Sequence, residues 1–495
     1  MPYSLQQSAA AASSATASTI SRSLLAVLGL YVLVWTLVPA LLHTAPPLDV
    51  VESGTWGREL VLMSFKHPNL PGLLVELGYR LTGQYGWPQY LISSLFAAGT
   101  IWIVYLLGRS ELPERQAAVG ALLLVGCYYF SWPVAEFNHN IAQLPFWAGI
   151  ALLLWLAVRH DKPLYWLALG LVAGLGFYAK LSTALIVAAG GLWVLLDPLA
   201  RSRLKGPWPW IAMAVFAAVL APLIAIVLQT DGRAISFIAE RGVGRGGAVE
   251  FLGAQLLNLL PVIIIVGLLI VLPQRSVRAH PADPDLRRFR RYLVLMAGVP
   301  IGVAAVVAGL NGAVSMWGTP MLNLVGLLVV AIYPNSVDLK LHRRVLVVAC
   351  ALVVAFPALY TLRDMVTAQT ARQPMRTQWP QAEIAARMGA IWREATGSTL
   401  RIVGGNDWEA GLIALGQAPR SSVFVNLDRR LSPWITEAEA QASGMLVVWS
   451  GDVVPDYVQP LLERHEAGIE RFAWSSAPSS DPLEIHYLIV PPRRD

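Results

Sequence analysis

The sequence predicts a polytopic α-helical membrane protein with about eleven transmembrane helices, followed by a small C-terminal α/β soluble domain. Of its 495 residues, 56% are hydrophobic and 14% are charged, whereas soluble globular chains carry about 25% charged residues. The apolar residues come in blocks of about 20, the length that crosses about 30 Å of hydrocarbon at about 1.5 Å per residue. From about residue 370 onward the composition becomes that of a soluble domain.

Lys and Arg are concentrated in the connections between apolar blocks. They are denser in the connections that lie inside if the N-terminus is cytoplasmic, and sparser in the longer connections on the other side. By the positive-inside rule, this pattern predicts a cytoplasmic N-terminus, an odd number of spans and an outside C-terminal domain. The candidate spans are residues 23–42, 88–108, 116–132, 141–158, 163–179, 182–197, 209–228, 251–272, 292–310, 317–333 and 344–362.

Three regions follow from this pattern. Residues 1–22 are rich in Ser, Ala, Thr and Gln, which predicts a disordered N-terminal tail. Residues 23–365 form the transmembrane domain, and residues 370–495 form the outside α/β domain. The apolar run after Arg22 is too long for the core of a signal peptide and lacks a cleavage site, so we expect an uncleaved first span.

The formal charge of +6 does not indicate a nucleic-acid partner. The basic residues form short clusters between apolar blocks instead of one continuous surface, so they are interpreted as determinants of topology. Cys127 and Cys350 each lie inside an apolar block, where cysteine behaves as a small hydrophobic residue. No disulfide framework is predicted.

Two outside connections are long enough to hold structure. Residues 229–250 contain a glycine-rich hinge that could order over a bound ligand or remain a plain flexible loop. Residues 43–87 alternate apolar and polar residues, as expected for helices lying in the membrane interface. The apolar positions of that alternation are Trp56, Leu60, Phe65, Leu70, Leu73, Leu74 and Leu77.

The C-terminal region alternates apolar runs with helix-like stretches, which predicts a largely parallel sheet. The predicted strands are 400–403, 422–425, 445–449 and 485–490, and the predicted helices lie near 378–394, 407–415 and 454–465. Gly404, Gly405, Asn406 and Asp407 follow a predicted strand, where an anion or sugar site is conceivable. A structural turn is the favoured interpretation, because two adjacent glycines are a weak signal.

The most informative residues are polar groups in the outside connections, since the bilayer makes such groups costly. Asp49 and Glu52 come directly after the first span and share a face if a helix begins there. A carboxylate near the membrane could act as a general base. The alternative is that Asp49 caps the free N–H groups of a helix.

Two further outside segments carry polar or basic clusters. Lys66 and His67 precede a turn stiffened by prolines and could hold a phosphate, or Lys66 could reach toward lipid headgroups. Glu136, Asn138 and His139 crowd one short connection between spans. Glu136 and His139 could ligate a metal or form a hydrogen-bonding wall for a sugar, and two ligands are weak evidence for a metal, so the wall is favoured.

Two more outside turns carry candidate residues. Lys180 lies at a turn with few other polar groups and could bind an anion such as a lipid phosphate or snorkel to the headgroups. Trp317 lies in a segment of small residues and could form a pocket lip, although an interfacial aromatic belt is the favoured interpretation.

This order of features resembles the GT-C glycosyltransferases, in particular the family 39 relatives that include protein O-mannosyltransferases and bacterial enzymes that add sugars to lipopolysaccharide. The likeness covers residues 23–335 well and the C-terminal domain loosely. Asp49 matches the first residue of the family's Asp-Glu pair, with Val50 in place of the Glu and Glu52 available to compensate. Residues 66–70 resemble the family's turn of a basic residue, two prolines and a leucine, with Asn69 in place of the second proline.

The resemblance implies a sugar donor carried on a polyprenyl phosphate and an inverting transfer at the outer face of a bacterial inner membrane. Asp49, with Glu52, would serve as the catalytic base. Lys66, His67, Lys180 and Arg58 would bind the lipid phosphate. Glu136, Asn138, His139 and Trp317 would bind the sugar or the acceptor. No metal and no other cofactor are expected, because a phosphate leaving group can be neutralised by Lys and Arg.

The expected acceptor is lipopolysaccharide or another envelope glycan, with protein O-glycosylation as an alternative. A transporter or lipid flippase also needs many spans and buried polar groups, but transporters commonly show repeated halves, and no repeat is visible here. A catalytically inactive relative that binds an envelope partner is a further alternative, because Val50 departs from the family pattern.

Overall fold

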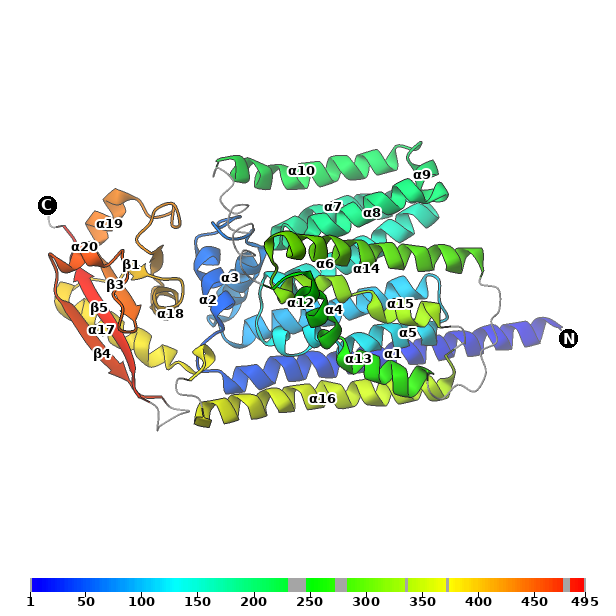
Figure 1. Ribbon diagram of the computed structural model, residues 1–495, viewed down its shortest axis with the longest axis horizontal. Helices are drawn as coiled ribbons and strands as arrows, with labels where there is room; N and C mark the ends of the chain where they lie inside the picture. The colour runs from blue at the N-terminus through cyan, green and yellow to red at the C-terminus, as the bar shows by residue number, and fades with distance from the viewer. Residues whose placement is uncertain are drawn as a thin grey trace. The chain divides into compact units, whose positions relative to one another are not determined.

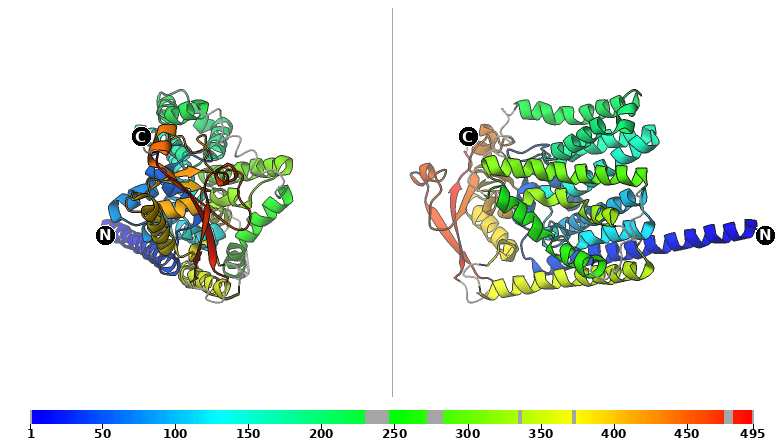
Figure 2. Two further views of the ribbon diagram at one scale, coloured as in Figure 1. Left: turned by 90° about the vertical axis from the view of Figure 1, so that its left-hand side faces the viewer. Right: turned by 45° about the vertical axis from the view of Figure 1, so that its right-hand side comes forward.

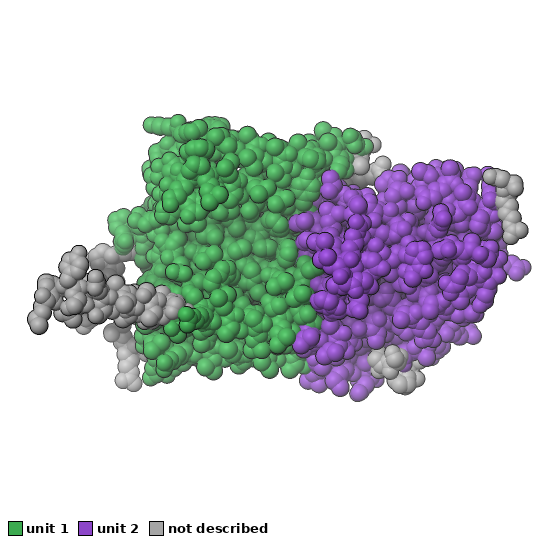
Figure 3. Space-filling model, turned by 180° about the vertical axis from the view of Figure 1, so that it is seen from behind, with its two compact units in different colours: residues 1–36, 91–135, 139–358 green, residues 37–90, 136–138, 359–495 purple. Residues whose placement is uncertain are grey.

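The computed structural model describes residues 2–229, 246–271, 283–333, 337–370, 374–474 and 481–493 (Figure 1). Most of the predicted glycine-rich connection 229–250 lies outside the described residues. The chain divides into two compact units, coloured separately in Figure 3. Unit 1 comprises residues 1–36, 91–135 and 139–358, and unit 2 comprises residues 37–90, 136–138 and 359–495.

Among the described residues, six helices are long and apolar enough to cross a membrane. Each matches a predicted span, because long charge-free apolar blocks favour a continuous helix whose backbone groups are satisfied internally. These helices are α1 (Pro2–Leu42), α4 (Trp87–Arg109), α6 (His139–His160), α10 (Trp208–Gln229), α14 (Pro284–Asn311) and α16 (Leu339–Thr370). The helix α1 begins at Pro2 and so includes most of residues 1–22. The disorder predicted for those residues stays a prediction.

Three further predicted spans are bent helix pairs, each with a proline within or next to it. The pairs bend by 86°, 53° and 50°, and counting each as one span gives up to nine among the described residues. Pro261 in the first turn of α13 explains the break after Asn258, because proline removes a backbone donor and clashes with the preceding turn. The pairs are α5 (Glu114–Leu122) and η1 (Leu123–Gly126) with η2 (Tyr128–Phe130) and η3 (Trp132–Ala135); α12 (Ala248–Asn258) with α13 (Leu260–Ile265) and η4 (Val266–Val271); and η5 (Ser315–Leu322) with α15 (Val325–Ile332).

Two shorter apolar helices, α7 (Pro163–Ala179) and α8 (Thr183–Leu196), occupy the remaining predicted positions, and the short α9 (Pro198–Arg203) follows them. The total of about eleven spans therefore stays a prediction. Figures 1 and 2 show α7, α8, α10 and α14 running lengthwise beside one another. A Cβ on Gly170 of α7 would lie 2.3 Å from the carbonyl oxygen of Ala212, so glycine is what allows α7 and α10 to pack this closely.

Unit 2 contains a five-stranded sheet in the order β2-β1-β3-β5-β4. β1 pairs in parallel with β2 and β3, whereas β5 pairs antiparallel with both β3 and β4. The sheet is therefore mixed. The prediction of a largely parallel sheet is correct for β2, β1 and β3 and wrong for β5 and β4, which pair antiparallel. The strands are β1 (Ile402–Gly405), β2 (Ser422–Val425), β3 (Met445–Ser450), β4 (Ala467–Phe472) and β5 (Leu483–Val490).

The sequence prediction missed β4, which lies at the edge of the sheet and alternates exposed with partly buried residues. An edge strand of this kind lacks the apolar run that marked the other four strands. The helices of this region are η6 (Arg376–Gln378), α17 (Gln381–Thr396), α18 (Glu409–Leu415), α19 (Glu437–Ser443) and α20 (Gln459–Leu462).

The predicted helices of connection 43–87 are present in unit 2 as α2 (Leu48–Arg58) and α3 (Leu70–Thr82). Gly57 and Gly72 let them approach closely, since a Cβ on Gly57 would lie 2.1 Å from the carbonyl oxygen of Gly72. α2 also packs on α18. Trp56, predicted to face the interface, is fully buried and packs edge-on against Phe65. α2 is therefore part of the protein core of unit 2.

Candidate active site

The predicted site residues divide between the two units. Those in unit 2 are Asp49, Glu52, Arg58, Lys66, His67, Glu136 and Asn138, and those in unit 1 are His139, Lys180 and Trp317.

Asp49 lies in the first turn of α2. Pro46 and Pro47 precede the helix, and Pro47, whose backbone is extended, is the N-cap residue, with no side-chain capping bond. The N-cap alternative for Asp49 is therefore wrong, because the helix has already begun at Leu48. A carboxylate in the first turn still suits the helix dipole. The Asp49 side chain is partly exposed, and Glu52 follows it by three residues on the same face.

Glu136 lies next to the start of α2. Its Oε1 accepts a 2.9 Å hydrogen bond from the backbone N–H of Asp49. Burial, together with the carboxylates of Asp49 and Glu52, raises the pKa of Glu136 to about 8, although Arg376 opposes the shift. The Glu136 carboxyl is therefore mainly protonated near neutral pH, where it can donate as well as accept a hydrogen bond.

Lys66 lies in the turn between α2 and α3 and is held by two carboxylates. Its Nζ donates to Oε1 of Glu52 and to Oδ2 of Asp407, each at 2.6 Å. The three side chains are only 14% to 16% exposed. Ser64 shapes the turn, since its Oγ accepts from the backbone N–H groups of Lys66 and His67 at 3.2 and 3.0 Å.

The charges of this cluster determine its protonation. Burial raises the pKa of Glu52 to about 7, with Asp407 and Asp49 adding to the shift and Lys66 opposing it. For Lys66, burial lowers the pKa, but Asp407 and Glu52 more than offset it, so its pKa is raised. Lys66 therefore stays charged, and the carboxylates of Glu52 and Asp407 both bind its ammonium group.

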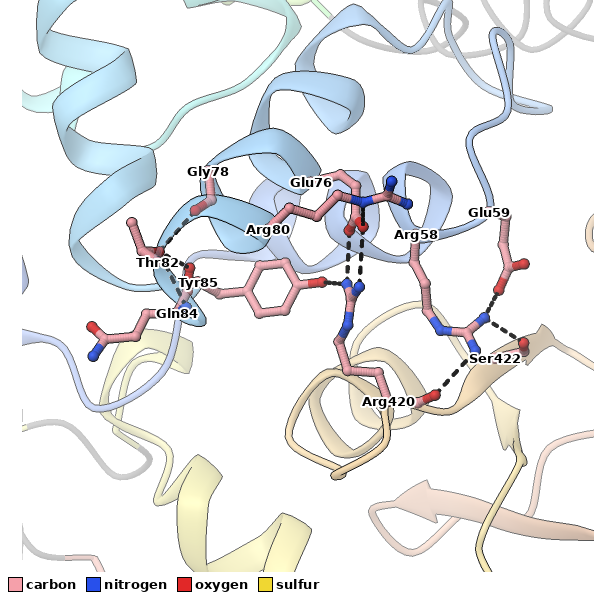
Figure 4. A network of polar contacts seen from close by, with 10 residues as sticks. All are labelled: Arg58, Glu59, Glu76, Gly78, Arg80, Thr82, Gln84, Tyr85, Arg420 and Ser422. Atoms are coloured by element: carbon pink, nitrogen blue, oxygen red, sulfur yellow. Dashed lines mark hydrogen bonds and ion pairs between the residues drawn. The ribbon is translucent and has the colours of Figure 1, made fainter.

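Arg58 was predicted to bind the lipid phosphate, but its guanidinium is engaged by other groups of the protein. Its guanidinium pairs with Glu59 and donates to Ser422 Oγ at 2.6 Å and to the Arg420 carbonyl at 3.0 Å (Figure 4). Arg58 thus connects the end of α2 to the start of β2. His67 is partly buried beside Lys66, and Asn138, two residues after Glu136, is buried.

A second arginine joins α3 to the segment before β2. Arg420 donates to both carboxylate oxygens of Glu76, at 2.7 and 3.0 Å, and to the Tyr85 hydroxyl (Figure 4). Its guanidinium lies 3.8 Å from the ring centroid of Tyr79, which stacks on Tyr85 at 4.6 Å. Glu76 is 2% exposed in its side chain, so this is a buried ion pair.

Asp407, Arg420 and Glu76 were not predicted as functional residues. Asp407 does lie in the Gly-Gly-Asn-Asp motif, and the predicted structural turn there is present, because Asn406 Oδ1 accepts the N–H groups of Trp408 and Glu409 at 2.9 and 3.0 Å. In the sequence, the signal that could have identified Asp407 as a functional residue was a carboxylate directly after a predicted strand. Its partner could not be identified, because Lys66 lies 341 positions earlier in the sequence.

In unit 1, Lys180 lies directly after α7, and its Nζ donates to Asn140 Oδ1 at 2.5 Å. His139 is buried at the start of α6, and Trp317 is partly buried in η5. Glu136 and His139, weighed together as a metal pair or a sugar wall, belong to different units. Among the described residues, no three His, Cys, Asp or Glu side chains are grouped to hold a metal ion, and a metal-independent reaction stays a prediction.

Residues 66–226 match the family model described as dolichyl-phosphate-mannose-protein mannosyltransferase. This stretch contains Lys66, Glu136 and Lys180 but neither Asp49 nor Glu52.

Two curated proteins are similar over parts of the chain. The "Putative mannosyltransferase YkcB" of Bacillus subtilis is 31% identical over 139 residues, which cover 28% of this chain and 19% of YkcB. The lipid A galacturonosyltransferase RgtD of Rhizobium johnstonii is 25% identical over 248 residues, which cover 48% of this chain and 51% of RgtD. The matches thus span about a fifth and about half of these relatives.

Two solved structures share the fold over nearly the whole chain. Both are of ArnT from Cupriavidus metallidurans. The one bound to undecaprenyl phosphate has a TM-score of 0.61 at 13% identity and covers 94% of this chain and 97% of ArnT. The apo structure has a TM-score of 0.62 at 14% identity and covers 93% and 97%. At this identity the likeness concerns the fold.

Proposed function

We propose that this chain, whose predicted resemblance to the family 39 GT-C glycosyltransferases is confirmed, transfers a sugar from a polyprenyl-phosphate-linked donor to an acceptor hydroxyl. The observation that carries the proposal is the cluster of Asp49, Glu52, Glu136 and Lys66 in unit 2. It combines half-buried carboxylates, suited to proton transfer, with an ammonium suited to a phosphate.

In the proposed reaction, the acceptor hydroxyl oxygen attacks the anomeric carbon of the donor sugar. Asp49 takes the hydroxyl proton as the new C–O bond forms, and the bond between the anomeric carbon and the phosphate oxygen breaks. The electron pair of that bond leaves with the polyprenyl phosphate. Asp49 suits this role because its side chain is partly exposed at the start of a helix, within reach of a substrate.

The neighbouring groups have supporting roles in this proposal. Lys66 stabilises the charge that grows on the departing phosphate. Protonated Glu136 donates a hydrogen bond to a sugar or acceptor oxygen, as its raised pKa allows. Glu52 keeps Lys66 in place and, with its pKa near 7, can exchange a proton with Asp49 or with solvent. His67, Asn138, His139, Lys180 and Trp317 stay candidates for substrate contacts.

Arg58 is a weaker candidate for binding the lipid phosphate than the sequence indicated. Its guanidinium already serves Glu59, Ser422 and the Arg420 carbonyl. We therefore assign it to holding α2 against β2, which positions Asp49 and Glu52 indirectly.

The proposed acceptor is lipopolysaccharide or another envelope glycan at the periplasmic face of a bacterial inner membrane. The name of RgtD, a lipid A galacturonosyltransferase, supports a glycolipid acceptor. The description of the matching family model, a protein mannosyltransferase, supports protein O-glycosylation as the second candidate. In either case the C-terminal domain and the site would lie on the side where the lipid-linked donor presents its sugar.

The test is a transfer assay with the full-length protein in lipid nanodiscs. A mixture of polyprenyl-phosphate sugars is offered with an envelope glycolipid extract or with an envelope protein extract, and release of free polyprenyl phosphate is followed with each. Release that depends on the acceptor supports the glycosyltransferase, and the extract that sustains it identifies the acceptor class. Absence of release with every donor, together with movement of the lipid between leaflets in vesicles, would replace it with the flippase alternative.

A further inference from the structure

Asp407 brings the C-terminal region into contact with the catalytic cluster. It follows β1, in a turn fixed by Asn406, and its Oδ2 accepts a 2.6 Å hydrogen bond from Lys66 Nζ. Its other oxygen, Oδ1, is buried and has no hydrogen-bond partner among the described residues. The carboxylate thus has one oxygen engaged and one available inside the site.

The contact matters because Lys66 serves two anions at once. An ammonium has three N–H donors, and Glu52 and Asp407 each take one at 2.6 Å. With both carboxylates ionised the trio carries one net negative charge, and with Glu52 protonated it is neutral, so in neither state does it attract a phosphate as a lone lysine would. A lipid phosphate can accept the one remaining N–H, but it can engage more than one donor of Lys66 only by displacing one of the two carboxylates.

The reaction changes the charge of the lipid. The donor is a phosphodiester with one negative charge, whereas the released polyprenyl phosphate is a monoester that carries between one and two at neutral pH. A lysine without a competing anion would therefore hold the product more tightly than the donor, and product release would be slow.

We propose that Asp407 competes with the lipid phosphate for the Lys66 ammonium and so weakens donor binding while speeding product release. Glu52 is the less suitable competitor, because it lies on the same helix as Asp49, three residues away, and moving it would disturb the base. Asp407 belongs to a different segment and can yield without moving α2. This inference rests on the proposed function of Lys66.

The test is binding of undecaprenyl phosphate to the full-length protein in nanodiscs, with wild type, Asp407→Asn, Lys66→Ala and the double variant. Asp407→Asn removes the competing charge but keeps the size of the side chain. We expect its Kd to be roughly tenfold lower than that of wild type, the scale of one nearby charge at an intermediate dielectric. Lys66→Ala should bind more weakly, and adding Asp407→Asn to it should recover much less than tenfold.

Asp452→Asn is the matched control, since it makes the same charge change at an exposed position of the same region. It should leave the Kd unchanged. In steady-state transfer, Asp407→Asn should lower both the donor KM and kcat, because the product leaves more slowly. A residue with only a structural role would instead raise KM and lower the unfolding temperature.

The outcomes separate this inference from the proposed function. If Lys66→Ala weakens binding but Asp407→Asn does not tighten it, the competition is refuted while the lipid-phosphate site stands. If Lys66→Ala leaves the Kd unchanged, Lys66 is not the phosphate ligand and the inference fails. Tighter binding by Asp407→Asn supports the competition even if no sugar transfer is detected with any donor, the result that would count against the proposed function.

Discussion

The backbone N–H of Asp49 donates a 2.9 Å hydrogen bond to Oε1 of Glu136, a residue 87 positions later in the sequence. The bond holds the first turn of α2 next to a half-buried carboxyl group in unit 2. It uses only the backbone of Asp49, so it does not occupy the carboxylate of the proposed base. Because this hydrogen bond lowers the pKa of Glu136, the position of the first turn of α2 and the protonation of Glu136 are coupled.

The first prediction concerns pH and stability. The folded-state pKa values of Glu52 and Glu136, about 7 and about 8, lie above the ordinary value of 4.5. Between these values the folded state binds more protons than the unfolded state, so stability must fall as pH rises. The contribution is fully present below about pH 4.5 and is lost as pH rises through 7 to 8.

We expect the unfolding temperature to fall by a few degrees from pH 6 to pH 9, measured by differential scanning fluorimetry in detergent. Glu136→Gln, which keeps an acceptor for the Asp49 N–H, should flatten this dependence. Glu463→Gln, at an exposed position, should reproduce the wild-type curve. An equally steep fall in the Glu136→Gln variant would show that Glu136 does not contribute to the pH dependence of stability.

Lys66 provides the second prediction. Lys66→Ala should lower kcat/KM for transfer by about 100-fold, the scale of losing one charged stabiliser of a transition state. It also leaves Glu52 and Asp407 without their shared cation, so its loss of stability should be larger at pH 8 than at pH 6. Lys66→Arg keeps the charge and should retain more activity than Lys66→Ala. Equal activity in the two variants would show that charge at this position is irrelevant.

Much of the fold could be predicted from the sequence, because a membrane span can be identified from the hydrophobicity of its own residues. A long apolar block without charge predicts a helix, and the six long helices lie where such blocks were found. The same was true of the four strands with apolar runs. β4 could not be identified, because an edge strand with alternating exposed residues resembles a surface loop.

The candidate site was harder to predict. Asp49, Glu52, Lys66 and Glu136 could be selected as polar groups near predicted spans, and the structure brings these four together in unit 2. Their partners depend on tertiary folding. Asp407 contacts Lys66 across 341 positions and Arg420 contacts Glu76 across 344, and no local pattern of residues records such a pairing.

The buried pair of Arg420 and Glu76 provides the third prediction. Arg420→Ala should lower the free energy of unfolding by about 2 kcal/mol, because the buried Glu76 then keeps only the half-exposed Arg80 as a charged partner. The measurement is chemical or thermal unfolding of the full chain. Arg430→Ala, which removes an arginine from an exposed pair with Asp428, is the control and should leave stability unchanged. Equal effects of the two substitutions would mean that the Arg420 pair contributes nothing particular to stability.

The contact between α2 and α3 provides the fourth prediction. A methyl group on Gly57 would lie 2.1 Å from a backbone oxygen of Gly72, so one of the two helices must move. We expect Gly57→Ala to destabilise the protein by about 2 kcal/mol and to reduce transfer, because α2 carries Asp49 and Glu52.

Gly99→Ala is the matched control for this contact. Gly99 is also helical, but a Cβ there meets nothing within 4 Å, so the substitution should be neutral or slightly stabilising. A Gly57→Ala variant as stable and active as Gly99→Ala would contradict the close packing of α2 on α3.

The most direct test of the account is the rate of sugar transfer from the polyprenyl-phosphate donor by Asp49→Asn, compared with wild type and Glu52→Gln. Removing a general base while keeping its shape should lower kcat by at least about 100-fold, while the variant still folds and still binds undecaprenyl phosphate. Glu52→Gln should retain a larger share of the activity, because Asp49 remains. An Asp49→Asn variant that transfers sugar at the wild-type rate would contradict the central claim that this carboxylate accepts the acceptor's proton.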